Sequence, residues 1–116
     1  MKNGLYSVHV KTLDGHFGKG SGVIVFRDGT ILGGDAFLFY TGTYESDGII
    51  LKGEMQIDQH TKPRDVAPLF GGRSVGIGFS GKIGDGESVM SGTALFGKQS
   101  IRFTATLRRI ADTQPS

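Results

Sequence analysis

The chain has 116 residues, the usual length of one domain with a single hydrophobic core. Hydrophobic residues make up 37% and charged residues 21%, a composition that excludes an intrinsically disordered or membrane-embedded chain. The net charge is only +2 and the basic residues are scattered, so direct binding of nucleic acid is not expected. Cysteine is absent, which excludes disulfides, thiolate zinc sites and cysteine nucleophiles.

The first residues contain no apolar segment of signal-peptide length, and no later apolar stretch is long enough to span a bilayer. We therefore expect a cytoplasmic protein without membrane contact. The 20 glycines, set against only 3 prolines and without a collagen period, indicate many tight turns and sharply coiled strands. Strands of a small closed barrel need such positions, because they must coil to close the sheet.

The first half of the chain predicts five strands joined by short turns. Residues 4–12 alternate between apolar and polar, and residues 19–27 contain the run 23–26, which is apolar on both faces. Such a run indicates a strand covered on both sides, by a dimer partner or a neighbouring segment. Asp28-Gly29 predicts a hairpin that returns as residues 30–33. An aromatic strand follows at residues 37–45.

The turn at Asp47-Gly48 leads to residues 49–58, the most regular alternation in the sequence. Its predicted inner face carries Ile49, Leu51, Gly53, Met55 and Ile57. The segment 59–72 has two prolines and no alternation, so we expect one short helical or irregular segment that covers one end of the sheet.

Strand patterns resume at residues 74–83, 87–96 and 99–110, and a polar tail occupies residues 111–116. The total of eight sequential antiparallel strands predicts an all-β, up-and-down barrel that forms a single domain over residues 1–110. Closure of the barrel would also remove the exposed edge strands.

Some short motifs suggest catalysis or cofactor binding, but the predicted structure around them does not fit such sites. Residues 76–81 match the pattern GxGxxG but lie inside an alternating strand with no helix after it, which argues against a dinucleotide site. Asp58 and His60 alone do not make a metal site, and no serine lies in a nucleophile elbow. We therefore expect a non-enzymatic protein without a metal or cofactor.

Four aromatic residues fall on faces predicted to point inward. They are Tyr6, Tyr40, Tyr44 and Phe79. In an eight-stranded barrel such rings either fill the core or line a cavity for a small apolar ligand, and the sequence leaves both alternatives open. Outside the barrel, Glu45 and Asp47 form an acidic hairpin tip, which is either a solvated turn or a docking site for a basic partner.

Several features of the first half follow one another in a recognisable order. They are Lys2-Asn3-Gly4-Leu5-Tyr6-Ser7, a glycine-rich second strand, an Asp-Gly turn, Gly33-Gly34-Asp35, and Tyr40-Thr41-Gly42-Thr43-Tyr44 before Ile49-Ile50-Leu51. In this order residues 2–58 resemble the GrlR family of small bacterial proteins, whereas the second half resembles it mainly in strand number.

The resemblance implies a lipocalin-like eight-stranded barrel with one short helix and a tendency to form homodimers. The family's namesake is a negative regulator of type III secretion gene expression. It sequesters a DNA-binding transcriptional activator through a continuous acidic loop after its fourth strand. The matching place here carries only Glu45 and Asp47, so the continuous acidic motif is absent.

Two functional hypotheses follow. The first is a regulator that contacts a protein partner, such as a transcriptional regulator, through Glu45 and Asp47. The second is a carrier or sensor of a small apolar ligand, bound among Tyr6, Tyr40, Tyr44 and Phe79 beneath residues 59–72. The hypotheses differ in how much empty volume the barrel interior must hold.

Overall fold

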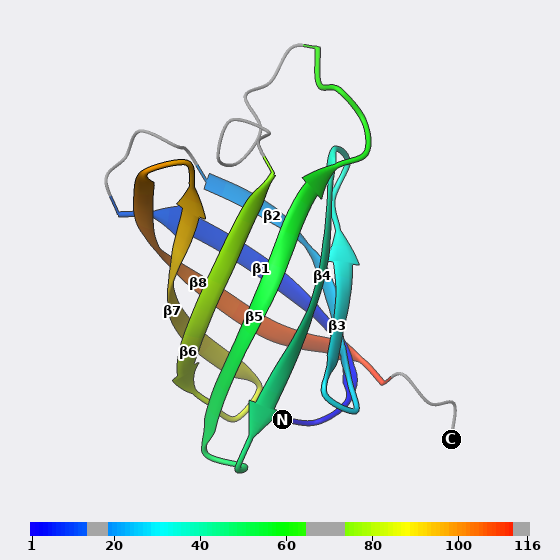
Figure 1. Ribbon diagram of the computed structural model, residues 1–116. Coiled ribbons are helices and arrows are strands. Elements are labelled where there is room, and N and C mark those ends of the chain that lie inside the picture. The colour runs from blue at the N-terminus through cyan, green and yellow to red at the C-terminus, as the bar shows by residue number, and fades with distance from the viewer. Residues whose placement is uncertain (14–18, 65–73, 113–116) are drawn as a thin grey trace.

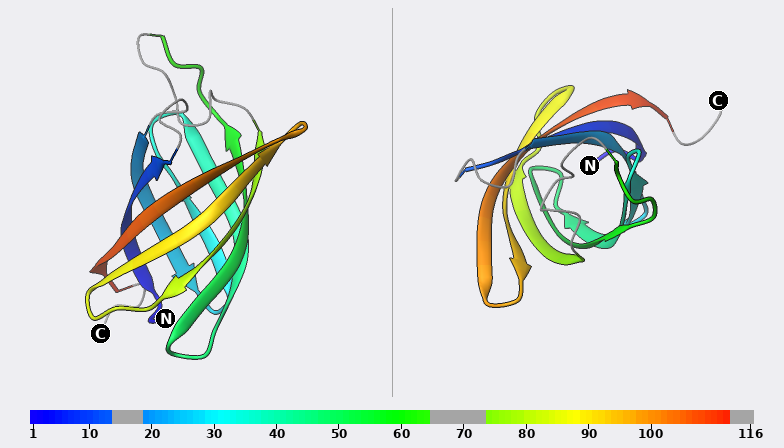
Figure 2. Two further views of the ribbon diagram at one scale, coloured as in Figure 1. Left: turned by 90° about the vertical axis from the view of Figure 1, so that its left-hand side faces the viewer. Right: turned by 90° about the horizontal axis from the view of Figure 1, so that it is seen from above.

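The structure, a computed structural model, describes residues 1–13, 19–64 and 74–112, without the side chains of Lys19 and Phe96. Its strands are β1 (Gly4–Thr12), β2 (Lys19–Arg27), β3 (Thr30–Gly34), β4 (Leu38–Ser46), β5 (Ile50–Gln59), β6 (Val75–Lys82), β7 (Glu87–Phe96) and β8 (Gln99–Ala111). Each strand pairs antiparallel with its neighbours in sequence, and β1 also pairs with β8 (Figure 1). The pairing closes the sheet into a barrel, which Figure 2 shows from the side and from one end.

The predicted eight-stranded antiparallel barrel is confirmed, and each strand begins and ends within one residue of its predicted bounds. Of the segment 59–72, Gln59 belongs to β5 and residues 60–64 form no helix. The rest of that segment lies outside the described residues, as do residues 113–116 of the predicted tail. Strand β8 extends through Ala111, one residue into the predicted tail.

Alternation along the strands separates a buried inner face from an exposed outer face. On β8, Phe103 and Leu107 are buried whereas Arg108 is exposed, as the sequence predicts. The prediction for Ile49 is wrong, because this side chain is 61% exposed. Strand β5 begins only at Ile50, so Ile49 belongs to the turn and is not held by the alternation of the strand.

Large inward side chains repeatedly lie directly opposite a glycine on the neighbouring strand. Examples are Ile24–Gly33, Met55–Gly42, Phe79–Gly53, Met90–Gly81 and Phe103–Gly92. A Cβ atom at Gly53 would lie 2.6 Å from Cζ of Phe79, and one at Gly92 would lie 2.5 Å from Cζ of Phe103. Non-bonded carbon atoms prefer about 3.5–4.0 Å, so both rings occupy space that any other residue would fill.

A row of directly paired inward positions crosses five adjacent strands, from β4 to β8. It consists of Tyr44, Gly53, Phe79, Gly92 and Phe103. Large rings thus alternate with glycines around this part of the barrel. Alternation of large and small residues lets a narrow barrel be filled without overlap.

Replacing Gly92 with alanine should lower the free energy of unfolding by about 1–3 kcal/mol, because the added methyl group overlaps the Phe103 ring. Gly78→Ala is the matched control, since a Cβ atom at this exposed β6 position meets nothing within 4 Å. Urea unfolding followed by circular dichroism measures both variants. Equal unfolding midpoints for the two variants would contradict the role given to the glycine–phenylalanine pairs.

Candidate functional site

The turn between β4 and β5 is a well-defined acidic tip. Oδ1 of Asp47 accepts hydrogen bonds from the backbone N–H groups of Ile50 (2.7 Å) and Ile49 (2.8 Å). Gly48 has a φ of 92° and donates its N–H to Oγ of Ser46 at 3.1 Å. The bonds from Ile50 and Ile49 lower the pKa of Asp47. The Asp47 carboxylate therefore shapes the turn while it remains exposed to solvent.

Glu45 lies beside this tip, on the outer face of β4. Its position is directly opposite Lys52 of β5, yet the two side chains form no ion pair. In the described part of the chain, the ion pairs are Arg27–Asp28 and Arg109–Asp112. The charges of Glu45 and Lys52 are therefore available to a binding partner.

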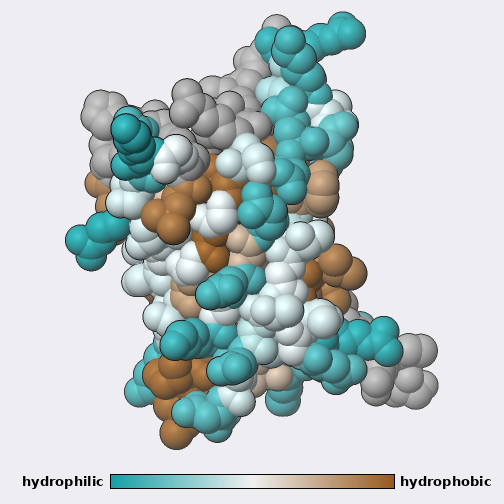
Figure 3. Space-filling model, in the orientation of Figure 1, coloured by the Kyte–Doolittle hydropathy of each residue, from teal (hydrophilic) through white to brown (hydrophobic). Residues whose placement is uncertain are grey.

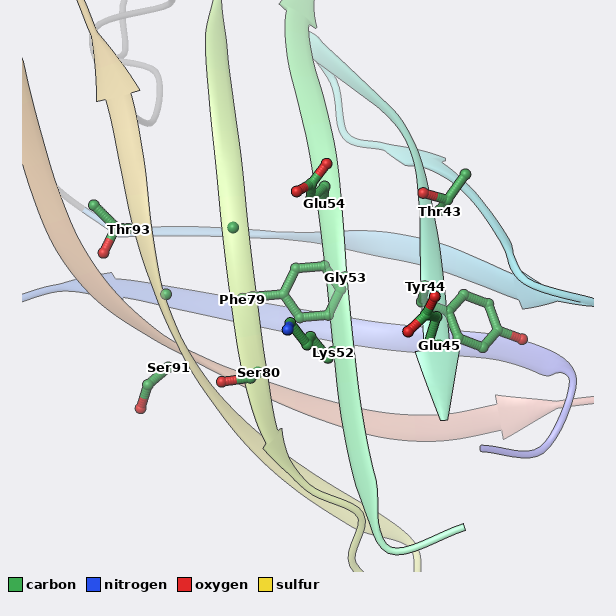
Figure 4. Close-up of a pocket in the computed structure, with 12 residues that line it drawn as sticks. Thr43, Tyr44, Glu45, Lys52, Gly53, Glu54, Phe79, Ser80, Ser91 and Thr93 are labelled. Carbon is green, nitrogen blue, oxygen red and sulfur yellow. The ribbon is translucent and has the colours of Figure 1, made fainter. Parts of the chain in front are cut away.

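A shallow groove runs beside these charged residues on the outer face of β4–β7 (Figure 4). It has a volume of about 610 Å³, and Thr43, Glu54, Ser80 and Ser91 are among its lining residues. The exposed Gly78 leaves part of the groove without side-chain cover. The lining offers hydroxyl and charged groups for hydrogen bonding but contains no histidine that could serve as a catalytic base.

The tip also exposes apolar side chains, which sequence reasoning did not assign to a site. Ile49 is 61% exposed and Ile50 44%, and Val89 of β7, outside the tip, is 55% exposed. Ile50 and Val89 both pair with Lys82, one from each side, so they flank the same position on the outer face. Figure 3 shows hydrophobic surface at the lower end of the molecule, where the β4–β5 turn lies, with hydrophilic surface around it. The alternation of apolar and polar residues cannot predict this exposure. It shows which residues share a face of a strand, but not at which residue the strand begins or ends.

Two of the predicted inward tyrosines are bonded to protein groups. The hydroxyl of Tyr6 donates to the carbonyl oxygen of Lys2 at 2.6 Å, and that of Tyr40 donates to Oδ2 of Asp35 at 3.2 Å. Burial raises the pKa of Tyr6. Burial, followed by the nearby Asp35 carboxylate, also raises the pKa of Tyr40. Both phenols are therefore neutral parts of the core at physiological pH.

The other two predicted residues also pack within the barrel. The half-buried ring of Tyr44 meets Phe26 edge-on, with 5.2 Å between ring centroids, and Tyr6 meets the same ring at 5.3 Å. Phe79 covers Gly53, as described above. Tyr6 and Tyr44 thus lie together on Phe26, whereas Tyr40 is bonded to Asp35 at the start of β4.

The interior holds almost no empty space. The cavity bounded by Tyr40, Phe79 and the apolar residues around them has a volume of about 40 Å³. Pockets for small organic ligands usually measure roughly 300–1,000 Å³. Among the described residues, the inward aromatic side chains thus surround a cavity much smaller than such a pocket.

Among the residues that the structure describes, no group of three or more histidine or carboxylate side chains is arranged to hold a metal ion. No helix in this part of the chain is long and apolar enough to cross a bilayer.

The charge on Asp47 should stabilise the fold at pH values above the ordinary aspartate pKa of about 4. Because the folded-state pKa is lowered, this stabilisation is fully present above that value and is lost as the pH falls through the folded-state pKa. Asp47→Asn should therefore melt at a lower temperature than wild type at pH 7, and the difference should shrink towards about pH 2.

Thermal melts at the two pH values measure this effect. Asp85→Asn is the control, because Asp85 occupies another exposed turn at the same barrel end and its carboxylate accepts no bond from the described residues. A pH-independent difference between wild type and Asp47→Asn would contradict a role for the charge.

Comparison with known proteins gives no family assignment. No protein-family model matches the chain, and no curated protein matches its sequence.

Proposed function

We propose that the protein is a non-enzymatic regulator that acts in the bacterial cytoplasm by contact with another protein, through its β4–β5 tip. The observation that carries this proposal is the exposure of Ile49 and Ile50 beside the carboxylates of Glu45 and Asp47. Apolar anchors within a charged rim are typical of protein–protein contact sites. The resemblance to the GrlR family, whose namesake uses the same loop, supports a transcriptional regulator as the partner.

The exposed groups of the tip indicate which groups a partner surface must offer. Ile49 and Ile50 require an apolar recess, and Glu45 and Asp47 require cationic groups beside it. Lys52, opposite Glu45, adds a positive charge to the rim, so a partner with an acidic group at the edge fits better than a uniformly basic one. The hydrogen bonds of Asp47 fix the turn in advance, so little conformational entropy is lost on binding.

The volume of the interior argues against the alternative, a carrier of a small apolar ligand. A cavity of about 40 Å³ has room for a few water molecules at most. Enlarging it would require movement of core rings such as Phe79, which are packed against glycine. A regulator that binds through its exterior needs no such space.

We also propose that the protein forms a homodimer through the outer face of β2 and β3. The run 23–26 is two-faced as the sequence indicates, because Ile24 and Phe26 are buried inside while Val23 is 44% exposed outside. Leu32, which pairs with Val25, is 60% exposed on the same outer face. Removal of these side chains from water would favour association.

The regulator proposal is tested by substitution at the tip. A tagged full-length chain is used to recover a DNA-binding regulator from the native host, and the affinity for the purified regulator is then measured. Ile50→Ser should weaken binding by about tenfold or more, because it removes an apolar anchor. Glu45→Ala should mainly slow association and reduce its dependence on salt, because the carboxylate lies on the exposed rim.

Matched controls lie elsewhere on the outer surface. Leu95→Ser removes an aliphatic side chain that is 60% exposed on β7, and Glu87→Ala removes an exposed carboxylate. Both should bind like wild type. Equal loss in tip and control variants, or failure to recover any DNA-binding regulator, would count against the proposal.

The dimer is tested by native mass spectrometry. The wild-type chain should appear as a dimer, and the double variant Val23→Ser, Leu32→Ser should appear as a monomer with an unchanged circular dichroism spectrum. Leu95→Ser serves again as the control, since its side chain is as exposed as that of Leu32. A wild-type monomer at micromolar concentration would overturn this proposal.

A further inference from the structure

One end of the barrel interior is polar, although the inner face is otherwise largely apolar. Inward positions there are occupied by Tyr6 on β1, Ser88 on β7 and Arg109 on β8. Arg109 continues the alternating inner face of β8, whose preceding member Leu107 is buried. The half-buried Arg109 is paired with Asp112, and it brings a charged group to an otherwise apolar inner face.

A β-bulge occurs at the same place. Leu5 pairs with Ala111 and Tyr6 pairs with Arg109, so the register of β1 and β8 shifts by one residue between them. The additional residue, Ile110, is 52% exposed. Bulges redirect side chains and are common beside binding sites. This one leaves the Arg109 position directly opposite the inward Tyr6.

The guanidinium of Arg109 has unused hydrogen-bonding capacity. Its Nη2 donates to the carbonyl oxygen of Asn3 at 3.3 Å and is paired with the carboxylate of Asp112. Its Nε is buried and has no acceptor among the described residues. A guanidinium carries five N–H donors, so these contacts and the hydrogen bond between Arg109 and the Tyr6 side chain still leave donors for an additional anion. Asp112 is 68% exposed at its side chain, so a competing anion could displace it.

A pocket opens at this end of the barrel. Its volume is about 450 Å³, within the usual range for small molecules and far above that of the interior cavity. It is called the end pocket here, and its lining includes Lys2, Tyr6, Gly48, Ile83, Gly84, Asp85, Gly86, Ser88 and Arg109. The buried Ser88 accepts the N–H of Gly84 at 3.0 Å, so its own hydroxyl proton can be donated to a ligand.

Charge and shape in the end pocket favour a small amphipathic anion. Lys2 and Arg109 supply two positive side-chain charges, against the carboxylates of Asp85 at the exposed rim and of Asp112, which is paired with Arg109. Ile83 and the glycines of the β6–β7 turn supply a lining without further charge. A guanidinium matches the paired oxygens of a carboxylate or phosphate.

We propose that the end pocket binds a small molecule carrying a carboxylate or phosphate group, with Arg109 as its charged partner and Ser88 as a neutral donor. This site is distinct from the small interior cavity and adjoins the protein contact proposed above. Gly48 of the β4–β5 turn lines the end pocket, so a bound anion lies beside the tip that contacts the partner.

Nuclear magnetic resonance titration of the full-length chain tests this site. The isotope-labelled protein is titrated separately with octanoate, inorganic phosphate and neutral 1-octanol. Octanoate, phosphate or both should shift the backbone amide signals of Gly48, Gly84 and Gly86, whereas octanol should leave them unchanged. The stronger of the two anions identifies the head group. Absence of shifts with both anions would overturn the proposal.

Substitutions then assign the charge. Arg109→Gln should weaken binding of the active anion by at least about tenfold, because it removes a charge-assisted hydrogen bond. Arg108→Gln is the matched control, since it removes the same charge from the adjacent exposed position of β8 and should bind like wild type. Equal affinities of the two variants would refute the role of Arg109. The wild-type titration decides the existence of the site even if Arg109→Gln does not fold.

Discussion

The internal width of an eight-stranded barrel determines what the interior of this protein can hold. Such a barrel has just enough room for side chains to fill it, or for one small ligand when they do not. Here large rings and glycines alternate across adjacent strands, and Phe79 over Gly53 and Phe103 over Gly92 are the tightest examples. The rings fill the lumen because the glycines leave space for them. A structure packed in this way has little volume left for a guest.

Because the lumen is filled, the ends and the outer face of the barrel are the surfaces that remain for binding. The same closed sheet that leaves no edge strand for pairing also holds the turns at fixed positions. The β4–β5 tip and the end pocket both lie at the end where β1 begins, and Gly48 belongs to both. The exposed apolar and acidic side chains of the tip and the cationic end pocket thus lie at one end of the barrel. Tyr40 lies towards the other end, where its hydroxyl donates a hydrogen bond to Asp35.

Much of this architecture could be predicted from local pattern. Period-two alternation and aspartate–glycine turns placed all eight strands, because both signals act within a few residues. The partners of the inward rings could not be predicted in the same way. Which glycine lies opposite Phe103 depends on the register between β7 and β8. The residue pattern of one strand does not determine this register. Ile49 was misplaced because the turn ends one residue later than the apolar pattern suggests.

The end pocket was missed for a related reason. Alternation places Arg109 on the same face as Leu107, yet a charged residue near a strand end is ordinarily solvent-facing, and the bulge at Ile110 leaves no mark in the sequence. Closure of the sheet has one more consequence, for how the chain acquires its structure. Strand β1 pairs with β8, from Leu5 opposite Ala111 onwards, so one edge of the first strand stays unpaired until the last strand has been synthesised. Contacts so distant in sequence are slow to form. The barrel can therefore close only when the β7–β8 hairpin meets β1.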